Sequence, residues 1–297
     1  MLPNLLIIGV PKAGTTSLFS YLNLHPQVFG SNPKEPGYFH PLRWGEELAD
    51  IAKYEEAFLG YSNQKYAMEA TPGYFYGGKK LSNEMKKLLP DSKVIVVLRD
   101  PVQRLFSFYK YKLSLGHIPS DLSFENYLDK CISMPLDEKI KKKNYDYWGM
   151  EGGLYANLLE TWNSTYGDNL KVCFFDDLVS DKNNFTSDIC DWLNLNFNEI
   201  DSKKMLIENK SMLYRSKALQ KFAISFDRSL EGLWNFMPFI KKPFSFFYNL
   251  FNSKPHNAVL TKSSKKELEE FYAKDIEKTR LFLEQKQISK FPEWMKV

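Results

Sequence analysis

A glycine loop between an apolar run and a helical pattern is the first place where this sequence can do chemistry. The run at 5–8 predicts a buried strand, Gly9 and Gly14 bound the loop, and a helical pattern follows. Backbone N–H groups of such a loop and of a helix N-terminus are unpaired, and the helix dipole adds positive charge. Further donors come from one lysine and three hydroxyl side chains: Lys12, Thr15, Thr16 and Ser17. Together they predict a site for phosphate or sulfate.

The cations of this loop differ from those of a nucleoside triphosphatase. Gly9 and Gly14 have Walker A spacing, but Thr15 stands where the lysine of that motif would follow, and the lysine is at position 12. A magnesium-dependent site also needs a carboxylate at the tip of a neighbouring strand, whereas the apolar run at 94–98 ends in Arg99. We therefore predict an anion site that is neutralised by lysine and arginine rather than by Mg²⁺.

A second group of polar residues follows the run at 94–98. Its β-branched residues predict a buried strand, and Pro101 suits the first turn of a helix. Arg99, Arg104 and Ser107 surround this helix start, and guanidinium groups bind phosphate oxygens with paired hydrogen bonds. We predict a second anion site here.

Strands and helices alternate along the chain and would hold both sites. Strands are predicted at 5–8, 66–69, 94–98 and 170–175, and residues 30–45 are predicted to form a loop. Helices are predicted at 15–24, 80–89, 102–115, 153–166, 181–193 and 265–284. This alternation predicts an α/β fold, a P-loop-like doubly wound parallel sheet flanked by helices, in a single domain over residues 1–297. Ligands of such sheets bind at the carboxyl ends of the strands, where both predicted sites lie.

Composition restricts the classes of function. The chain has 297 residues, of which 43% are hydrophobic and 26% are charged, so it is globular rather than disordered. Its net charge of +4 is too small to predict nucleic-acid binding. The three cysteines have no CxxC spacing and no histidine partners, and we expect no metal. No segment approaches the roughly 20 apolar residues of a membrane span, and Met1 leaves no room for a signal peptide, so we expect a cytoplasmic protein.

The two anion motifs resemble those of sulfotransferases that use 3′-phosphoadenosine 5′-phosphosulfate (PAPS). The resemblance implies that the first loop binds the 5′-phosphosulfate, through Pro11, Lys12, Ala13, Gly14, Thr15, Thr16 and Ser17. It also implies that Arg99 and Ser107 bind the 3′-phosphate, and that 3′-phosphoadenosine 5′-phosphate (PAP) is the product. Within this family, the chain most resembles the sulfotransferases that modify glycans, which include heparan sulfate sulfotransferases and their bacterial relatives.

The resemblance extends into the last third of the chain. Asn209 to Arg215 is similar to the family's adenine-side segment, which implies that Tyr214 or Arg215 stacks on adenine. Lys254 falls near the family's basic loop and is expected to contact the nucleotide. We expect residues 205–297 to be mostly helical, with loops closing over nucleotide and acceptor.

Three side chains are candidates for the base that takes the acceptor proton. Glu35, in Lys34-Glu35-Pro36-Gly37-Tyr38-Phe39, is similar to the glutamate that serves as base in glycan sulfotransferases and is our first choice. Glu69 is the second choice, and His40 is the third because another branch of the superfamily uses histidine. Ala70 stands where heparan-type enzymes carry a lysine, which leaves Lys12 to stabilise the leaving phosphate.

The acceptor stays open at this stage. We expect a hydroxyl, with an amine as the second choice, on a sugar, a glycolipid or a β-hydroxyacyl chain on a carrier protein. A divergent P-loop kinase and a non-catalytic nucleotide-binding protein are the alternatives from other classes. The apolar, cationic run at 233–247 would suit a packed lid or contact with a lipid surface. The lysines at 139–143 are expected to form a solvated face. Nothing in the sequence predicts the oligomeric state.

Overall fold

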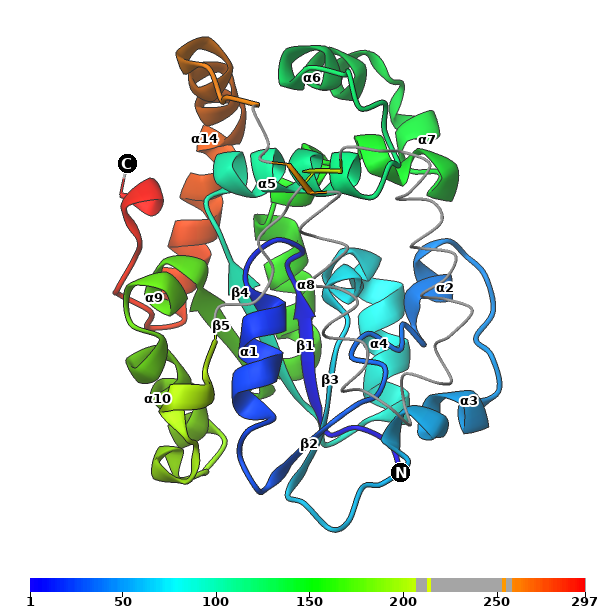
Figure 1. Cartoon of the computed structure of the whole chain (residues 1–297), viewed down its shortest axis with the longest axis vertical. Coiled ribbons are helices and arrows are strands. Elements are labelled where there is room, and N and C mark those ends of the chain that lie inside the picture. The colour runs from blue at the N-terminus through cyan, green and yellow to red at the C-terminus, as the bar shows by residue number, and fades with distance from the viewer. Residues whose placement is uncertain (207–212, 215–252, 255–257, 297) are drawn as a thin grey trace.

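Five parallel strands form the central sheet of the structure, a computed structural model that describes residues 1–206, 213–214, 253–254 and 258–296 (Figure 1). The strands, in chain order, are β1 (Leu5–Gly9), β2 (Val28–Gly30), β3 (Tyr66–Ala70), β4 (Lys93–Leu98) and β5 (Leu170–Phe174). Their order across the sheet is β2-β3-β1-β4-β5, so β1 is central. The predicted α/β fold with a parallel sheet is confirmed.

Helices cover both faces of this sheet. Those between β1 and β5 are α1 (Thr15–Leu22), α2 (His40–Arg43), α3 (Ile51–Glu55), α4 (Gly78–Leu88), α5 (Pro101–Ser114), α6 (Phe124–Ser133), α7 (Leu136–Lys139) and α8 (Ala156–Tyr166). After β5 come α9 (Phe175–Ser180), α10 (Lys182–Trp192) and the long α14 (Lys262–Gln285). Figure 1 shows α1 in front of the sheet and α8 behind it, where α8 also packs against α4 and α14.

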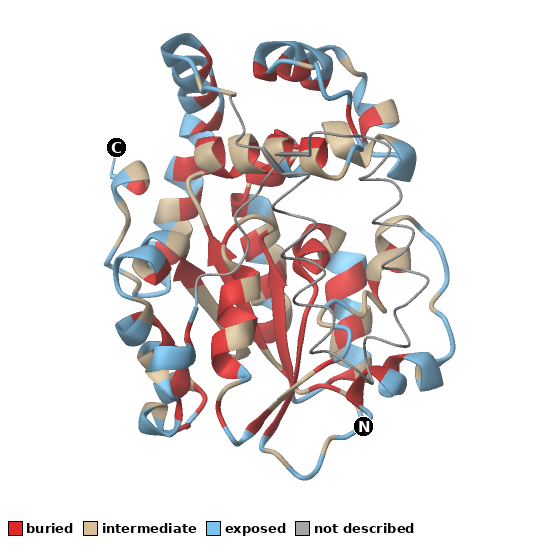
Figure 2. Cartoon of the chain, in the orientation of Figure 1, coloured by how far each residue is buried: buried red, intermediate tan, exposed pale blue. Residues whose placement is uncertain are grey.

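Burial on both faces explains the composition of the strands. Every residue of β1 and β3 is buried, and so are the last five of β4 (Figure 2). A parallel sheet with helices on both faces leaves no solvent side, and its strands therefore read as continuous apolar runs instead of alternating ones. Glu69 in β3 is the exception and lies fully buried in this apolar layer.

The register between β1 and β4 brings the two predicted anion motifs together. Ile7 pairs with Ile95 and Gly9 with Val96, and the Val10 N–H donates to the Val97 carbonyl at 3.0 Å. The two strands therefore end side by side. The loop after Gly9 and the segment after Leu98 start from neighbouring points of the sheet.

Several short elements were not predicted. The fifth strand, β2, is only three residues long and is formed by pairing with β3, so no local pattern marks it. The predicted loop at 30–45 contains the one-turn helix α2, and α3, α6, α7 and α9 were also missed. A signal for α6 was present, because Ser123 caps it by accepting a hydrogen bond from the Asn126 N–H at 3.1 Å.

Long elements were predicted to within a few residues. The predicted helix at 153–166 begins later, at Ala156, because residues 151–153 form a 3₁₀ turn. α14 begins three residues before its predicted start, after Thr261 caps it through the Ser264 N–H. The expected closing loops within 205–297 lie largely outside the described residues, as does the apolar run at 233–247. The single domain over 1–297 stays a prediction.

Candidate functional site

The loop between β1 and α1 has the open backbone that an anion site needs. Lys12 and Gly14 are both left-handed, with φ of 73° and 79°. Gly14 is the N-cap of α1, and no side chain caps this helix. The first N–H groups of α1 lack intrahelical acceptors, as in every α-helix, and so remain available to a ligand.

The remaining predicted residues of this loop differ in exposure. Ala13 is fully buried, Thr15 and Ser17 are buried in the first turn of α1, and Pro11 and Thr16 are partly exposed. Thr16 is therefore the hydroxyl that the surface of this turn presents.

Gly14 is required by packing as well as by backbone geometry. A Cβ atom at this position would collide with the Leu178 side chain and crowd the Phe175 ring. α9, which carries both side chains, thus lies directly against the loop. A positive φ and a close neighbour together leave room only for glycine.

Arg99 joins the second motif to the first. Its Nη1 donates to the Lys12 carbonyl oxygen at 2.7 Å, and its guanidinium lies 4.4 Å from the centre of the Phe175 ring. The Arg99 carbonyl in turn accepts a hydrogen bond from the Tyr155 hydroxyl at 2.8 Å. Arg99 therefore holds the left-handed Lys12 backbone in place, a conformation that costs about 1 to 2 kcal/mol in a non-glycine residue.

Three cations gather at this junction. Burial, Arg99 and Lys110 together lower the pKa of Lys12 to about 8, and the charge of Glu35 opposes them. Burial and Arg99 also lower the pKa of Lys110. The Lys12 ammonium lies 4.4 Å from the centre of the Tyr111 ring. Cations that depress one another's pKa values are stabilised by an anion placed among them.

Lys110 and Tyr111 are site residues that the sequence reasoning missed. Both lie on α5, three and four residues after Ser107, which is partly exposed. Residues at this spacing share one face of a helix. The spacing was therefore a usable signal once Ser107 had been placed on a helix.

The neighbouring Arg104 does not belong to the anion site, and its place in the predicted cluster is corrected. It is 1% exposed, and its Nη2 donates to the Gly149 carbonyl. Tyrosines 76, 155 and 272 surround it and raise its pKa against the effect of burial. Arg104 thus ties α5 to the interior.

Asp100 has a structural partner of its own. Its carboxylate caps α5 by accepting from the Val102 N–H at 2.9 Å and the Gln103 N–H at 3.5 Å. Among the described residues no group of three or more His, Cys, Asp or Glu side chains is placed to hold a metal ion.

The loop that carries Glu35 is fastened to the end of β3. The Lys34 carbonyl accepts from the Ala70 N–H at 3.2 Å, and the Gly37 N–H donates to Thr71 Oγ1 at 3.3 Å. The Glu35 side chain itself is 51% exposed and forms an ion pair with Lys34 at 2.7 Å. Its charge raises the pKa of Lys12, so the predicted base lies within electrostatic range of the predicted anion loop.

Glu69 lies below this loop with no exposed surface. It accepts hydrogen bonds from the Tyr54 hydroxyl and from Thr71 Oγ1, the latter at 2.7 Å. Burial raises its pKa to about 7, and these hydrogen bonds oppose the rise. The Thr71 hydroxyl, which donates to Glu69, also accepts the hydrogen bond from the Gly37 N–H. Because the Glu69 carboxylate is enclosed and both of its oxygens are hydrogen-bonded, we infer that it positions this loop and does not contact an acceptor.

His40 begins the one-turn helix α2 beside the same loop. Burial and then Arg43 lower the pKa of His40 to about 4, so the imidazole is neutral at physiological pH. It packs edge-on against Tyr74 at 5.3 Å between ring centres. Glu35 also acts on its pKa, so His40 lies on the Glu35 side of the site.

Two short strands contain residues predicted to contact the nucleotide. β6 (Leu213–Tyr214) and β7 (Ser253–Lys254) pair antiparallel, with Tyr214 opposite Ser253 and Leu213 opposite Lys254. β6 lies beside α5, the helix that carries Ser107. Arg215 lies outside the described residues. The pairing thus brings Tyr214 and Lys254 close to the second motif, although 40 positions separate them in the chain.

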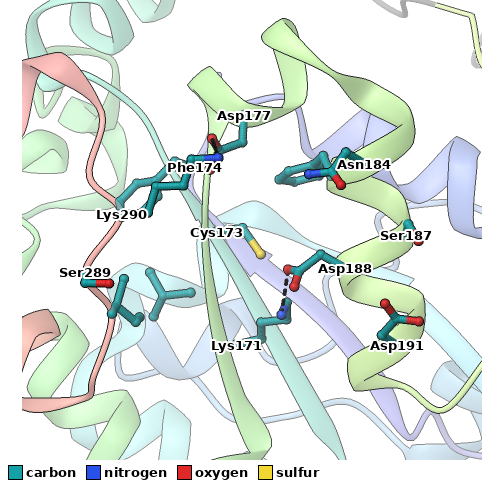
Figure 3. Close-up of a pocket in the computed structure, with 13 residues that line it drawn as sticks. Lys171, Cys173, Phe174, Asp177, Asn184, Ser187, Asp188, Asp191, Ser289 and Lys290 are labelled. Carbon is teal, nitrogen blue, oxygen red and sulfur yellow. Dashed lines mark ion pairs between the residues drawn. The ribbon is translucent and has the colours of Figure 1, made fainter.

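A pocket of about 500 Å³ lies elsewhere, beside the edge strand β5. Figure 3 shows it between α10 and the segment after α14, with β5 as its floor. Lys171 and Asp188 form an ion pair in it at 2.8 Å, and Lys290 pairs with Asp177 at 3.8 Å. None of the predicted site residues whose side chains the structure describes lines this pocket.

The basic run at 139–143 is neutralised within the protein. Lys139 is buried and pairs with Glu151 at 2.6 Å, and Lys142 pairs with Glu46 at 2.8 Å. Lys141 and Lys143 both contact Glu138. Only part of the run is thus the solvated face that was expected.

In the part of the chain that the structure describes, no helix combines the length and the apolarity of a membrane span.

Known proteins resemble this chain in parts of their length. A membrane-associated sulfotransferase, kil1 of Dictyostelium discoideum, is 36% identical over 131 residues, which cover 43% of this chain and 27% of the relative. The heparan sulfate glucosamine 3-O-sulfotransferase 3B1 of Mus musculus is 32% identical over 54% of this chain and 38% of its own length. Carbohydrate sulfotransferase 15 of Mus musculus is 24% identical over a stretch that covers 85% of this chain and 52% of the relative. The chain therefore spans between about a quarter and half of these relatives.

A solved structure shares the fold. The sulfotransferase of Alicyclobacillus acidocaldarius superposes with a TM-score of 0.60 at 23% identity and covers 80% of this chain and 96% of its own. The sulfotransferase domain family matches residues 2–295. With nearly the whole chain matched and both anion motifs joined at the ends of β1 and β4, this chain belongs to the sulfotransferase domain family.

Proposed function

We propose that the protein transfers a sulfuryl group from PAPS to a hydroxyl of a carbohydrate or glycolipid acceptor. The observation that carries the proposal is the hydrogen bond between Arg99 and the Lys12 carbonyl, which unites the two anion motifs into one cationic junction. A donor with phosphate groups at two positions needs such a pair of neighbouring sites. Family membership supports the same donor.

The loop and α5 fit the two ends of this donor. The open N–H groups of α1, with Lys12 and Thr16, would hold the phosphosulfate end, and Arg99 with Ser107 would hold the 3′-phosphate. The donor supplies an activated sulfuryl group whose transfer leaves negative charge on a phosphate. The Lys12 ammonium would stabilise this charge without a metal.

Glu35 is the proposed base. Its exposed carboxylate acts on the pKa of Lys12, so an acceptor hydroxyl placed between these two side chains would have a base on one side and the cationic loop on the other. Loss of the hydroxyl proton in the transition state would raise the nucleophilicity of its oxygen. The Lys34 partner would hold the Glu35 carboxylate in place.

The acceptor class rests on the relatives. Their names specify heparan sulfate and carbohydrate acceptors, and on this basis we favour a sugar hydroxyl over an amine or a β-hydroxyacyl chain on a carrier protein.

A P-loop kinase is the candidate from another class. It is disfavoured because Asp100, the carboxylate nearest the expected metal position, is engaged as a helix cap. The cytoplasmic location stays a prediction.

Calorimetric titration with PAP and, separately, with ATP and Mg²⁺ tests the donor. We expect PAP to bind without metal and at least tenfold more tightly than ATP, because only PAP carries the 3′-phosphate for Arg99 and Ser107. Arg99→Ala should weaken PAP binding about tenfold or more, as for a lost charge-assisted hydrogen-bond pair. Tight binding of ATP alone, or a strict metal requirement, would refute the proposal.

A further inference from the structure

Arg43 is surrounded by aromatic rings next to the proposed acceptor side of the site. Its guanidinium carbon lies 4.6 Å from the ring centres of both Tyr145 and Trp148, 4.7 Å from that of Trp44 and 5.2 Å from that of Tyr76. Tyr76 is buried, whereas the other three rings and Arg43 are partly exposed. We call these five residues the Arg43 cluster.

The guanidinium of Arg43 has rings around it but no acceptor within the described part of the chain. None of the described residues accepts a hydrogen bond from it or forms an ion pair with it. Aromatic rings attract a cation through their faces and leave the five N–H donors of an arginine, which lie in its plane, unused. A positioned guanidinium with unused donors is suited to an oxyanion, which it binds through two parallel hydrogen bonds.

Electrostatic effects on two shared neighbours, His40 and Tyr111, relate the cluster to the reacting residues. Arg43 follows His40 by three residues in α2, and both Arg43 and Glu35 act on the pKa of His40. On the other side, Tyr111, against which Lys12 lies, has its pKa raised by burial and then by Glu35 and Tyr145. The cluster therefore lies within electrostatic range of two residues, His40 and Tyr111, on which Glu35 also acts, and Tyr111 contacts Lys12.

The rings themselves suit a sugar. Partly exposed Trp and Tyr side chains offer broad apolar surface, and the C–H face of a pyranose ring packs on such surface while its hydroxyls stay hydrated. An anionic substituent on the same sugar would reach the N–H edge of the guanidinium. A neutral acyl chain would use the rings and leave Arg43 unpaired, which is unfavourable for a partly buried cation.

We propose that the Arg43 cluster binds an acidic sugar of the acceptor, with the rings against the sugar and Arg43 on its carboxylate or sulfate. This inference deepens the proposed function and rests on it. It assigns Arg43 as the residue that selects anionic over neutral acceptors. Carboxylate and sulfate share the chemistry that Arg43 recognises, and the test separates them.

Binding of three tetrasaccharides, measured by calorimetry with and without saturating PAP, tests the inference. The first alternates glucuronic acid with N-acetylglucosamine, the second is its neutral carboxyl-reduced form, and the third is the neutral form carrying sulfate esters. We expect one or both anionic probes to bind at least tenfold more tightly than the neutral one. Arg43→Gln should remove this preference while changing neutral binding less than twofold.

Matched variants distinguish a specific contact from general charge or misfolding. Lys142→Gln removes a nearby exposed cation and should change each affinity less than twofold. Arg43→Lys keeps the charge without the planar fork and should retain only part of the preference. Thermal unfolding and PAP affinity of each variant report on folding.

Equal binding of all three probes, no binding of any, or an equal loss for all three in Arg43→Gln would overturn the inference. Failure of the proposed function is a separate outcome, because the PAP and ATP titrations contain no saccharide. Transfer of labelled sulfate to the preferred probe would join the two results.

Discussion

Lys12 shows how one side chain acquires its chemistry from neighbours that are distant in sequence. Its backbone is held by Arg99, its ammonium lies over Tyr111, and Lys110 and Glu35 act on its charge in opposite directions. Burial has the largest effect, and all these influences together bring the pKa of Lys12 to about 8. The site therefore holds a cation that is close to losing its proton at mildly alkaline pH.

Sulfate transfer should consequently decline as the pH rises through about 8. The charged form of Lys12 exists below its pKa and is the form that stabilises the leaving phosphate, so kcat/KM for the donor should fall above this pH. The measurement is a pH profile of kcat/KM at saturating acceptor. Lys12→Arg should lack this decline, since guanidinium keeps its proton. The same decline in Lys12→Arg would assign it to another group.

Replacing Glu35 should separate proton removal from donor binding. Glu35→Gln keeps the size of the side chain but removes the base, and we expect transfer to fall at least 100-fold while PAP affinity changes less than twofold. Steady-state kinetics and PAP titration check the two parts. Glu47→Gln, on an exposed residue of the following segment, is the control. Near-normal transfer by Glu35→Gln would move the base to His40 or Glu69.

At the scale of elements, the adjacency of β1 and β4 decides where the site is. Both strands are parallel and end together, so the glycine loop and the start of α5 emerge side by side. α9 then closes against the loop from the neighbouring strand β5, with Phe175 contacting Arg99 and crowding Gly14. Three βα connections thus build one anion site.

A methyl group at Gly14 should damage both packing and donor binding. Gly14→Ala meets a positive φ and a collision with Leu178, and we expect a loss of about 2 to 4 kcal/mol of unfolding free energy together with loss of PAP binding. Gly45→Ala is the matched control, because Gly45 has a similar φ of 74° but no heavy atom within 4 Å of an added Cβ, and it should cost about 1 kcal/mol. Denaturant unfolding measures both. Equal losses would show that packing against α9 is unimportant.

At the scale of the whole molecule, the last long helix fixes the middle of the chain. Asp275 in α14 accepts hydrogen bonds from the Tyr155 N–H at 2.6 Å and the Ala156 N–H at 3.4 Å, so it caps α8 from 120 positions away. Tyr272 in the same helix donates to the Met150 carbonyl at 2.8 Å and lies beside Arg104. α14 therefore supports Tyr155, which contacts the Arg99 carbonyl.

Removing this long-range cap should destabilise the protein. Asp275→Ala leaves the first N–H groups of α8 without their acceptor, and a loss of about 1 to 2 kcal/mol is expected from the usual effect of an N-cap. Glu277→Ala, on the exposed side of the same helix, should change stability by less than about 0.5 kcal/mol. Denaturant midpoints compare them. Equal stability of the two variants would mean that α8 does not depend on this cap.

Local patterns in the sequence were sufficient for the long elements and the two anion motifs. Strands such as β4 are continuous apolar runs, and Asp100 and Pro101 mark the start of α5 within the chain itself. They were not sufficient where the stabilising partner is remote. β2 depends on β3, and α8 begins where Asp275 caps it. Arg104 was expected at the anion site because its spacing on α5 does not show that it points inward.

The sequence alone determined that this chain has a strand, loop and helix for an anion, a second cationic motif and no Walker lysine, because these depend on neighbouring residues. Only the tertiary structure decided that Arg99 holds the Lys12 loop, that Lys110 and Tyr111 join the site, and that Arg43 lies among four rings. Such contacts depend on the register of parallel strands and on helix packing. Both are fixed by residues far apart in the chain, so no local pattern records them.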